Sequence, residues 1–458
     1  MRINIPGYVE NIIDRLESNG YEAYIVGGCV RDMLLGRVPK DYDITTNALP
    51  DEVEMLFRDF KTVSVGKEFG TIIVCHDMGP VEVTTFRREG KYLDGRRPQW
   101  VFFSRKIEDD LSRRDFTINA IAYNSRRGII DPFDGQKDIN LRIIRTVGMP
   151  DERFREDYLR IMRAVRFAAE LDFEIEEETL EAAKSYSRLV ERVSMERITD
   201  EFFKMIMCSI PSKGIRLLEE TGLLDIVLPE LIPAIGFQQR NPHHEMDVYN
   251  HILCVLDNTS PILEVRLAAL FHDIGKPHTL TVDEEGVGHF YGHDRLGADI
   301  AREALKRLRA SNLLIKNVCT LVKEHMNHHA HFKDKGLKRL IRRVGENEIF
   351  NLMELQKADI KCSNKEATID HILERERRIR EIIDNNEPYN LSQLNINGND
   401  LMNLGFQEGP ILRDVLQYLL DRVMEEPDKN RKDVLKEMAM ERFLKKSVSG
   451  NKEEEINF

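Results

Sequence analysis

The pattern of apolar residues changes once along the chain, near residue 150. Before that point, short runs typical of strands, at 21–26, 71–75 and 81–86, alternate with segments of helical period. Beyond it, apolar residues recur at i, i+3 and i+4, which indicates helices. We therefore predict an α+β fold, with a small mixed sheet in the N-terminal part and helices after it.

The chain has 458 residues, enough for about three or four domains. Prolines interrupt the helical pattern near 229–242, and eleven of the 13 histidines lie between His243 and His331. We predict a head at 1–150, a helical neck at 151–240, a histidine-rich domain at 241–370 and a helical body or tail at 371–458.

Charge and hydropathy exclude several protein classes. With 67 basic and 79 acidic residues the net charge is −12, which excludes a uniformly basic coat for nucleic acid but permits a local basic groove. No apolar run approaches the roughly 18 residues that span a bilayer, and the N-terminus lacks the apolar stretch of a signal peptide. We expect a cytoplasmic protein with no membrane partner.

Six cysteines are scattered along the chain and form no CxxC pair. In a reducing compartment such residues are buried thiols, and disulfides are not expected. They are Cys29, Cys75, Cys208, Cys254, Cys319 and Cys362.

Two features of the first 90 residues indicate phosphate and metal chemistry. Gly27 and Gly28 lie between a predicted strand and a predicted helix, where backbone N–H groups can approach a phosphate closely. Asp41 and Asp43 are two residues apart, so on a strand their carboxylates share one face and can hold Mg²⁺. Glu82, on another predicted strand, is the best candidate for a third catalytic carboxylate.

The run Gly-Gly-x-Val-Arg-Asp-x-Leu-Leu-Gly at 27–36, followed by Asp-x-Asp, resembles the bacterial class II tRNA nucleotidyltransferases. These are CCA-adding enzymes with poly(A) polymerase relatives, in the polymerase-beta-like superfamily. Four further motifs agree in order, at 113–120 (ribose and triphosphate contacts), 131–135 (hinge), 156–160 (base selection) and 197–201 (helix stabilisation). The resemblance covers about 1–230. It implies nucleotide-binding roles for Gly27, Gly28, Arg31, Arg114, Asp115, Asn119, Asp157 and Arg160.

The base-selecting pair has a chemical rationale. Asp157 and Arg160 are three residues apart, so on a continuous helix they share a face. The carboxylate accepts from the exocyclic amine of cytosine or adenine, and the guanidinium donates to the adjacent ring nitrogen. Uracil and guanine present a carbonyl instead, which leaves polar groups unpaired at a cost of about 1–3 kcal/mol. The segment 94–98 is similar to a flexible loop present in CCA-adding and A-adding members.

A second group of residues indicates a metal site in the histidine-rich domain. His272 and Asp273 are adjacent, and an imidazole and a carboxylate from such a pair can bind one divalent ion. Together with His251 and Asp359 they resemble the ligand set of HD-domain metal phosphohydrolases. The resemblance implies a transition metal (Mn, Fe, Co, Ni or Zn), and His293 and His325 match positions that bind a second metal or phosphate in some members.

The C-terminal part is less informative. Residues 396–402 and 408–412 resemble the body and tail of Firmicute-type enzymes, which would make the histidine-rich domain an insertion between neck and tail. Basic residues at 333–343 would either contact phosphate or form a solvated face.

We predict an enzyme that adds CCA to tRNA 3′ ends from CTP and ATP, with Mg²⁺ bound by Asp41 and Asp43. One alternative is an A-adding enzyme or a poly(A) polymerase. Another is an RNA-binding HD phosphohydrolase with an inactive head. The HD domain would hydrolyse cyclic phosphates or phosphomonoesters at RNA ends, or would be a relic that supports tRNA.

Overall fold

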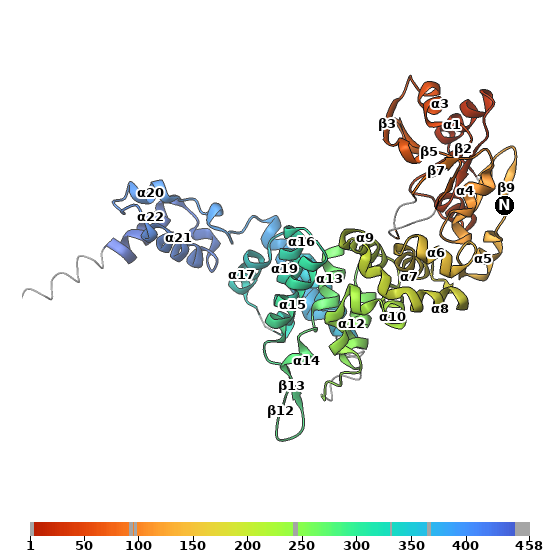
Figure 1. Cartoon of the computed structure of the whole chain (residues 1–458). Coiled ribbons are helices and arrows are strands. Elements are labelled where there is room, and N and C mark those ends of the chain that lie inside the picture. The colour runs from red at the N-terminus through yellow and green to blue at the C-terminus, as the bar shows by residue number, and fades with distance from the viewer. Residues whose placement is uncertain are drawn as a thin grey trace, which may run out of the picture. The chain divides into compact units, whose positions relative to one another are not determined.

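The computed structural model describes residues 4–90, 95, 99–240, 246–329, 332–363 and 368–444. The chain forms two compact units, Met1–Ile232 and Pro233–Phe458 (Figure 1). Each unit is described by itself below. None of the helices in the described ranges is both long and apolar enough to cross a membrane.

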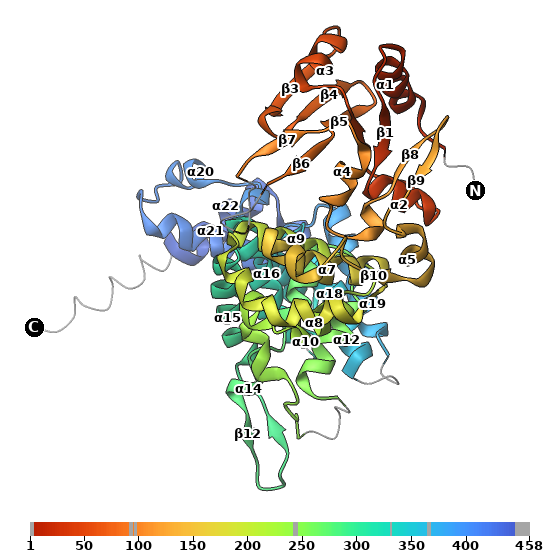
Figure 2. The same ribbon diagram turned by 45° about the vertical axis from the view of Figure 1, so that its right-hand side comes forward.

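A seven-stranded mixed sheet forms the centre of the first unit, as the sequence pattern predicts (Figure 2). Its strand order is β3-β4-β5-β2-β1-β8-β9, and only β2 and β5 pair in parallel among its described strands. The strands are β1 (Ala23–Val26), β2 (Asp43–Thr46), β3 (Lys61–Gly66), β4 (Thr71–His76), β5 (Gly79–Thr85), β8 (Ala122–Asn124) and β9 (Gly128–Ile130).

Short helices and a separate strand pair complete this part of the unit. Val9, Ile12, Ile13 and Leu16 are buried at the helical spacing that the sequence predicts. The elements are α1 (Gly7–Ser18), α2 (Gly28–Leu34), α3 (Pro50–Leu56), β6 (Arg87–Glu89), β7 (Val101–Phe103), α4 (Ile107–Ser112) and α5 (Gly135–Leu141).

Helices follow the sheet in the same unit, and α7 packs on α9 and α10. They are α6 (Pro150–Glu156), α7 (Leu159–Leu171), α8 (Glu177–Tyr186), α9 (Met195–Ile206), α10 (Pro211–Glu220) and α11 (Leu224–Val227), with a small parallel pair of β10 (Ile143–Ile144) and β11 (Glu174–Ile175).

One expectation for these helices is wrong. Asp157 does not lie on a helix with Arg160, because its backbone is extended (φ −140°, ψ 108°) where α6 ends. Its side chain instead accepts a hydrogen bond from the backbone N–H of Leu159 at the start of α7. The two residues therefore reach their surroundings from different elements.

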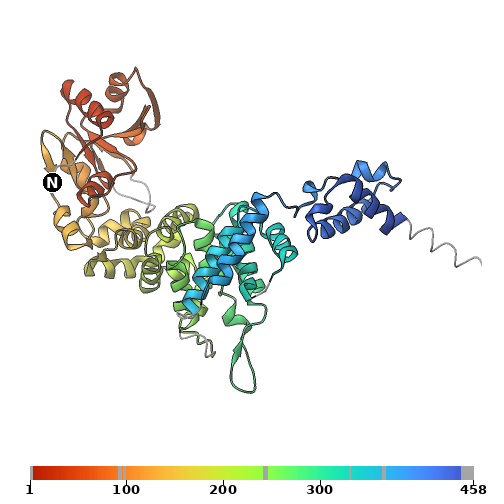
Figure 3. The ribbon, with the colours of Figure 1, turned by 180° about the vertical axis from the view of Figure 1, so that it is seen from behind.

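The second unit is helical and contains a small hairpin (Figure 3). In its first part α12, α13, α16 and α18 pack together. The elements are α12 (Val248–Asp257), α13 (Leu263–Phe271), α14 (Lys276–Thr279), β12 (Thr281–Val282), β13 (Gly288–His289), α15 (His293–Arg307), α16 (Asn312–Glu324), α17 (Asp334–Val344), α18 (Ile349–Ser363) and α19 (Asp370–Asp384).

The last helices, α20 (Gly398–Met402), α21 (Pro410–Val423) and α22 (Lys432–Ala439), have an apolar core of their own around Leu401, Leu419 and Leu435. The basic run at 333–343 lies on α17, except for Lys333, which directly precedes the helix. Lys338 of that run is buried and forms an ion pair of 2.8 Å with Glu387, so this cation serves packing within the unit.

Candidate active site and metal centre

Three carboxylates line one cavity of about 710 Å³ in the first unit. Asp43 begins β2 and lies directly opposite Glu82 in the parallel β2–β5 register. Asp41 precedes the strand by two residues, and the intervening Tyr42 is buried while Asp41 is exposed. The alternation puts Asp41 and Asp43 on the side of Glu82, as the Asp-x-Asp spacing predicts.

The electrostatics of this cavity fit a divalent cation. Burial, together with the neighbouring carboxylates of Glu82 and Asp41, raises the pKa of Asp43 to about 6 against the opposing effect of Arg114. Like charges that destabilise one another in this way are relieved by an oxygen-liganded cation. The three carboxylates are nevertheless more widely spaced than the metal clusters of the second unit, whose donor atoms lie within 4.8 Å.

Cationic side chains near the glycine turn at 27–28 line the same cavity as the three carboxylates. Gly27 has a φ of +81°, and a Cβ there would lie 2.7 Å from Arg114 Nη1, so the missing side chain leaves room for the guanidinium. Arg114 Nε is buried and has no hydrogen-bond partner among the described residues. Arg31 donates from Nη1 to Asn119 Oδ1 at 2.8 Å. Gly28, Arg31, Arg114 and Asn119 all line the cavity, which therefore combines carboxylates that could hold a cation with polar and cationic groups that could hold a polyphosphate.

Asp115 also lines this cavity but is held by protein groups. Its carboxylate accepts from Arg163 Nε at 2.7 Å and from the Asn119 amide at 3.1 Å. Burial alone would raise the pKa of Asp115, but the Arg163 guanidinium and these hydrogen bonds hold it well below its ordinary value. Asp115 is thus an ionised residue that positions Arg163 and Asn119.

Further residues of the cavity were missed by the sequence reasoning. Arg163 and Arg166 of α7 and Lys204 of α9 line it together with Phe167. A signal was present for two of them, since arginines recur every third residue at 160, 163 and 166 along a helical segment. No comparable signal indicates Lys204, because its position depends on the packing of α9 against α7.

The pair predicted to select the base, Asp157 and Arg160, does not line the cavity. Asp157 accepts from Arg197 Nη2 at 2.8 Å, and Arg160 donates from Nη1 to Glu156 at 2.5 Å and from Nη2 to the Arg113 carbonyl at 3.0 Å. Both polar groups thus have protein partners. The predicted loop at 94–98 lies outside the described residues except for Gly95, whose carbonyl accepts from the backbone N–H of Tyr158 at 3.2 Å.

The second unit brings the four predicted HD ligands into one buried cluster. His251 Nε2 lies 3.4 Å from Asp273 Oδ2 and 3.2 Å from Asp359 Oδ1, and His272 Nε2 lies 3.4 Å from Asp273 Oδ2. That oxygen of Asp273 is 2.7 Å from Lys276 Nζ but accepts no hydrogen bond of good geometry from the described residues. A buried carboxylate oxygen among imidazole nitrogens fits a metal ion.

A second cluster shares Asp273. Its other oxygen, Oδ1, lies 3.4 Å from His293 Nε2 and 3.8 Å from His325 Nε2. The Nδ1 atoms of His272, His293 and His325 lie 2.6–2.8 Å from backbone carbonyls, which directs each Nε2 toward the clusters. Burial and the neighbouring His272 lower the pKa of His325 to about 3, so its imidazole is neutral, as a metal ligand must be.

Comparison with known proteins shows which family this chain is similar to. The Poly A polymerase head domain matches residues 23–145, the probable RNA and SrmB-binding site of polymerase A matches 172–235, and the HD domain matches 243–360. The CCA-adding enzyme of Pediococcus pentosaceus is 36% identical over 422 residues, which cover 92% of this chain and 93% of that protein. The chain belongs to the CCA-adding enzyme family. Its members are tRNA nucleotidyltransferases.

The CCA-adding enzyme of Geobacillus kaustophilus is 51% identical over 212 residues, and the match spans about half of each chain, 46% of this one and 52% of that one. A crystal structure of the Bacillus stearothermophilus CCA-adding enzyme in complex with CTP matches with a TM-score of 0.73 at 30% identity, covering 96% of this chain and 98% of that chain. With such coverage the residues at 241–370 have a counterpart in that structure. The expected placement of this domain between neck and tail stays a prediction.

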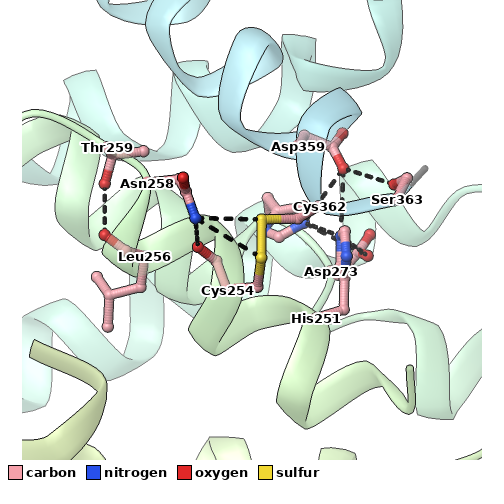
Figure 4. The surroundings of a disulfide bond; sticks show 10 residues. His251, Cys254, Leu256, Asn258, Thr259, Asp273, Asp359, Cys362 and Ser363 are labelled. Carbon is pink, nitrogen blue, oxygen red and sulfur yellow. Dashed lines mark hydrogen bonds and ion pairs between the residues drawn. A yellow bond between two sulfur atoms is a disulfide. The ribbon is translucent and has the colours of Figure 1, made fainter. Parts of the chain in front are cut away.

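The expectation that no disulfide forms is also wrong. Cys254 of α12 and Cys362 of α18 are bonded, with their Cα atoms 5.9 Å apart (Figure 4). Sequence spacing could not indicate this pair, because 108 residues separate the two cysteines and only the packing of α12 on α18 brings them together. This chain thus has a covalent link beside the predicted HD ligands His251 and Asp359.

Proposed function

We propose that the head adds CCA to tRNA 3′ ends from CTP and ATP. The observation that carries this proposal is the Asp43–Glu82 pair, with Asp41, in the same cavity as Arg31 and Arg114. These carboxylates would hold Mg²⁺, which activates the 3′-hydroxyl of the primer and stabilises the leaving pyrophosphate. Because tRNA is the proposed substrate, we expect the activity to be cytoplasmic.

The remaining cavity residues bind and orient the nucleotide. Arg31 and Arg114 neutralise the triphosphate beside the glycine turn, and Arg163, held by Asp115, extends this positive surface. Asp157 and Arg160, which do not line this cavity, select the base. Each of them has two or more polar contacts with the protein, so pairing with cytosine or adenine exchanges some of those contacts for contacts to the base edge.

Incubation of the full chain with tRNA lacking CCA, and with each nucleotide separately and together, tests this function. The proposal predicts two added residues with CTP alone and a completed CCA end with CTP and ATP. A single A added only to tRNA ending in CC indicates an A-adding enzyme, and a long A tail indicates a poly(A) polymerase. Either of those products refutes CCA addition. No product with any nucleotide supports the inactive-head alternative.

We also propose a phosphohydrolase activity in the HD domain, acting on 2′,3′-cyclic phosphates or phosphomonoesters at RNA ends. Its motivation is the pair of buried clusters that share Asp273. The clusters would hold Mn, Fe, Co, Ni or Zn, since imidazole ligands favour transition metals. Metal analysis of the full chain, together with hydrolysis of an RNA ending in a cyclic phosphate, tests this activity. A protein that binds no metal and hydrolyses no such RNA end would support the alternative that the HD domain is a relic that only supports tRNA.

A further inference from the structure

The Cys254–Cys362 disulfide joins the two helices that supply His251 and Asp359 to the first candidate metal cluster. Cys254 follows His251 by three residues on α12, and Cys362 follows Asp359 by three residues on α18 (Figure 4). A spacing of three is one helical turn, so each sulfur lies on the same side of its helix as the ligand. The bond and the 3.2 Å contact between His251 and Asp359 join the same two helices.

The bond is also within reach of small thiols. Cys362 is buried, but Cys254 is only half-buried. The exposed Asn258 lies at the pair, with its Nδ2 3.7 Å from one sulfur and 3.6 Å from the other. In a reducing compartment such a bond is reversible, and disulfides there are usually transient or redox-sensing.

We propose that Cys254 and Cys362 form a redox-active pair that controls metal binding at the His251–His272–Asp273–Asp359 cluster. The inference rests on the proposed metal site of the HD domain. Its oxidant is a low-molecular-weight disulfide such as glutathione disulfide. One cysteine thiolate attacks that disulfide and releases one glutathione. The second cysteine thiolate then attacks the mixed disulfide, closes the Cys254–Cys362 bond and releases the second glutathione. Two protein thiols are oxidised and one glutathione disulfide is reduced to two thiols. The two protons that the cysteine thiols give to solvent are taken up by the two released glutathione thiolates.

The effect is confined to one of the two clusters. His251 and Asp359 are supplied by the two bonded helices, so the bond holds these ligands at their observed separation. Asp273, His293 and His325 form the second cluster, and none of the three lies on α12 or α18. Reduction of the disulfide therefore weakens metal binding at the first cluster and leaves metal binding at the second cluster unchanged. Loss of a group that orients a ligand weakens metal binding by roughly 10–100-fold, and we expect about tenfold here.

The test is a titration of the full chain with Mn²⁺ in two states. One sample is oxidised with glutathione disulfide and desalted, the other is kept reduced with a phosphine, and mass spectrometry of the peptides confirms the Cys254–Cys362 bond. We expect one Mn²⁺ to bind about tenfold more weakly to the reduced protein. The Cys254→Ser/Cys362→Ser variant should bind Mn²⁺ like the reduced protein under both conditions. The single variant Cys254→Ser serves the same purpose if the double variant does not fold.

Three results overturn the proposal. Equal Mn²⁺ affinity in both states refutes redox control but leaves the HD metal site intact. Failure of the Cys254–Cys362 bond to form with glutathione disulfide also refutes the control alone. Absence of Mn²⁺ binding in both states refutes the metal site itself, and redox control with it. The His272→Ala variant is the control for the metal site, because loss of this proposed ligand should lower Mn²⁺ binding in both redox states. CCA addition, which uses other residues, should not change with redox state.

Discussion

At the scale of single residues, the head combines carboxylates and guanidiniums in one cavity. Asp43 has its pKa raised to about 6, whereas Asp115 is held ionised by Arg163. Burial raises the pKa of both groups. At Asp43 two carboxylates add to this effect and Arg114 offsets it only in part, whereas at Asp115 Arg163 and the hydrogen bond from Asn119 outweigh it. The first arrangement suits a cation that is bound and released, and the second suits a permanent support for binding groups.

Base selection gives the first prediction at this scale. Asp157→Ala or Arg160→Ala removes a hydrogen-bonding group that we propose favours cytosine and adenine, and each such contact is worth about 1–3 kcal/mol of discrimination. We expect incorporation of UTP and GTP relative to CTP and ATP to rise roughly tenfold or more. The measurement is incorporation of all four nucleotides onto one tRNA, with Arg155→Ala, an exposed neighbour, as the control. Variants that become slower but discriminate as before would show that the pair does not select the base.

Asp115 gives a prediction about acid stability. Its folded pKa lies below the unfolded value of about 3.9, so its ionised form stabilises the first unit above that pH and the contribution is lost as pH falls through the folded pKa. Asp115→Asn should therefore lower the free energy of unfolding at pH 7 by about 2 kcal/mol, the value of hydrogen bonds to a charged group. Denaturant unfolding from pH 7 to pH 3 should show the difference from wild type shrinking below about pH 4. A difference that is constant over this range contradicts the assigned role.

At the scale of elements, the turn between β1 and α2 is built around a close approach. Gly27 in this turn and Gly36, which follows α2, both adopt positive φ, at +81° and +72°. A Cβ at Gly27 would meet Arg114 at 2.7 Å, whereas a Cβ at Gly36 would meet no atom within 4 Å. Both positions therefore require glycine for the backbone, but only Gly27 also makes space for a binding group.

A matched pair of variants separates these two requirements. Gly27→Ala and Gly36→Ala should each cost about 1–2 kcal/mol of stability through the left-handed backbone. Only Gly27→Ala should also displace Arg114 and raise the KM for nucleotides. Steady-state kinetics on tRNA lacking CCA, with unfolding curves for both variants, measure the two effects. Equal kinetic parameters in the two variants would show that the Arg114 contact is unimportant for nucleotide binding.

The sequence predicted those elements whose pattern is local. The strands at 71–75 and 81–86 are confirmed as β4 and β5, and the buried stripe of α1 is confirmed. The Asp-x-Asp strand was recognised from its chemistry, since β2 itself is only four residues long. The Cys254–Cys362 bond and the place of Lys204 in the cavity depend on how helices pack, so no local pattern contained them. The break at Asp157 was missed because α6 and α7 together have a continuous helical period.

At the scale of the whole molecule, the residues of the two proposed chemistries lie in separate units. Asp41, Asp43 and Glu82 lie in the first unit, and both histidine clusters lie in the second. The two sets also differ in donor type, with oxygen ligands suited to Mg²⁺ in the head and mixed nitrogen and oxygen ligands suited to transition metals in the HD domain. Each unit should therefore tolerate loss of the other's metal ligands.

The rate of CCA addition to tRNA by Asp43→Asn and by His272→Ala, measured beside wild type, tests the central claim most directly. Asp43→Asn should bind tRNA but add nucleotides roughly a thousandfold more slowly, because charge stabilisation by a bound metal is worth several kcal/mol. His272→Ala should add CCA at the wild-type rate. Addition near the wild-type rate by Asp43→Asn, or its loss in a folded His272→Ala protein, would contradict the account.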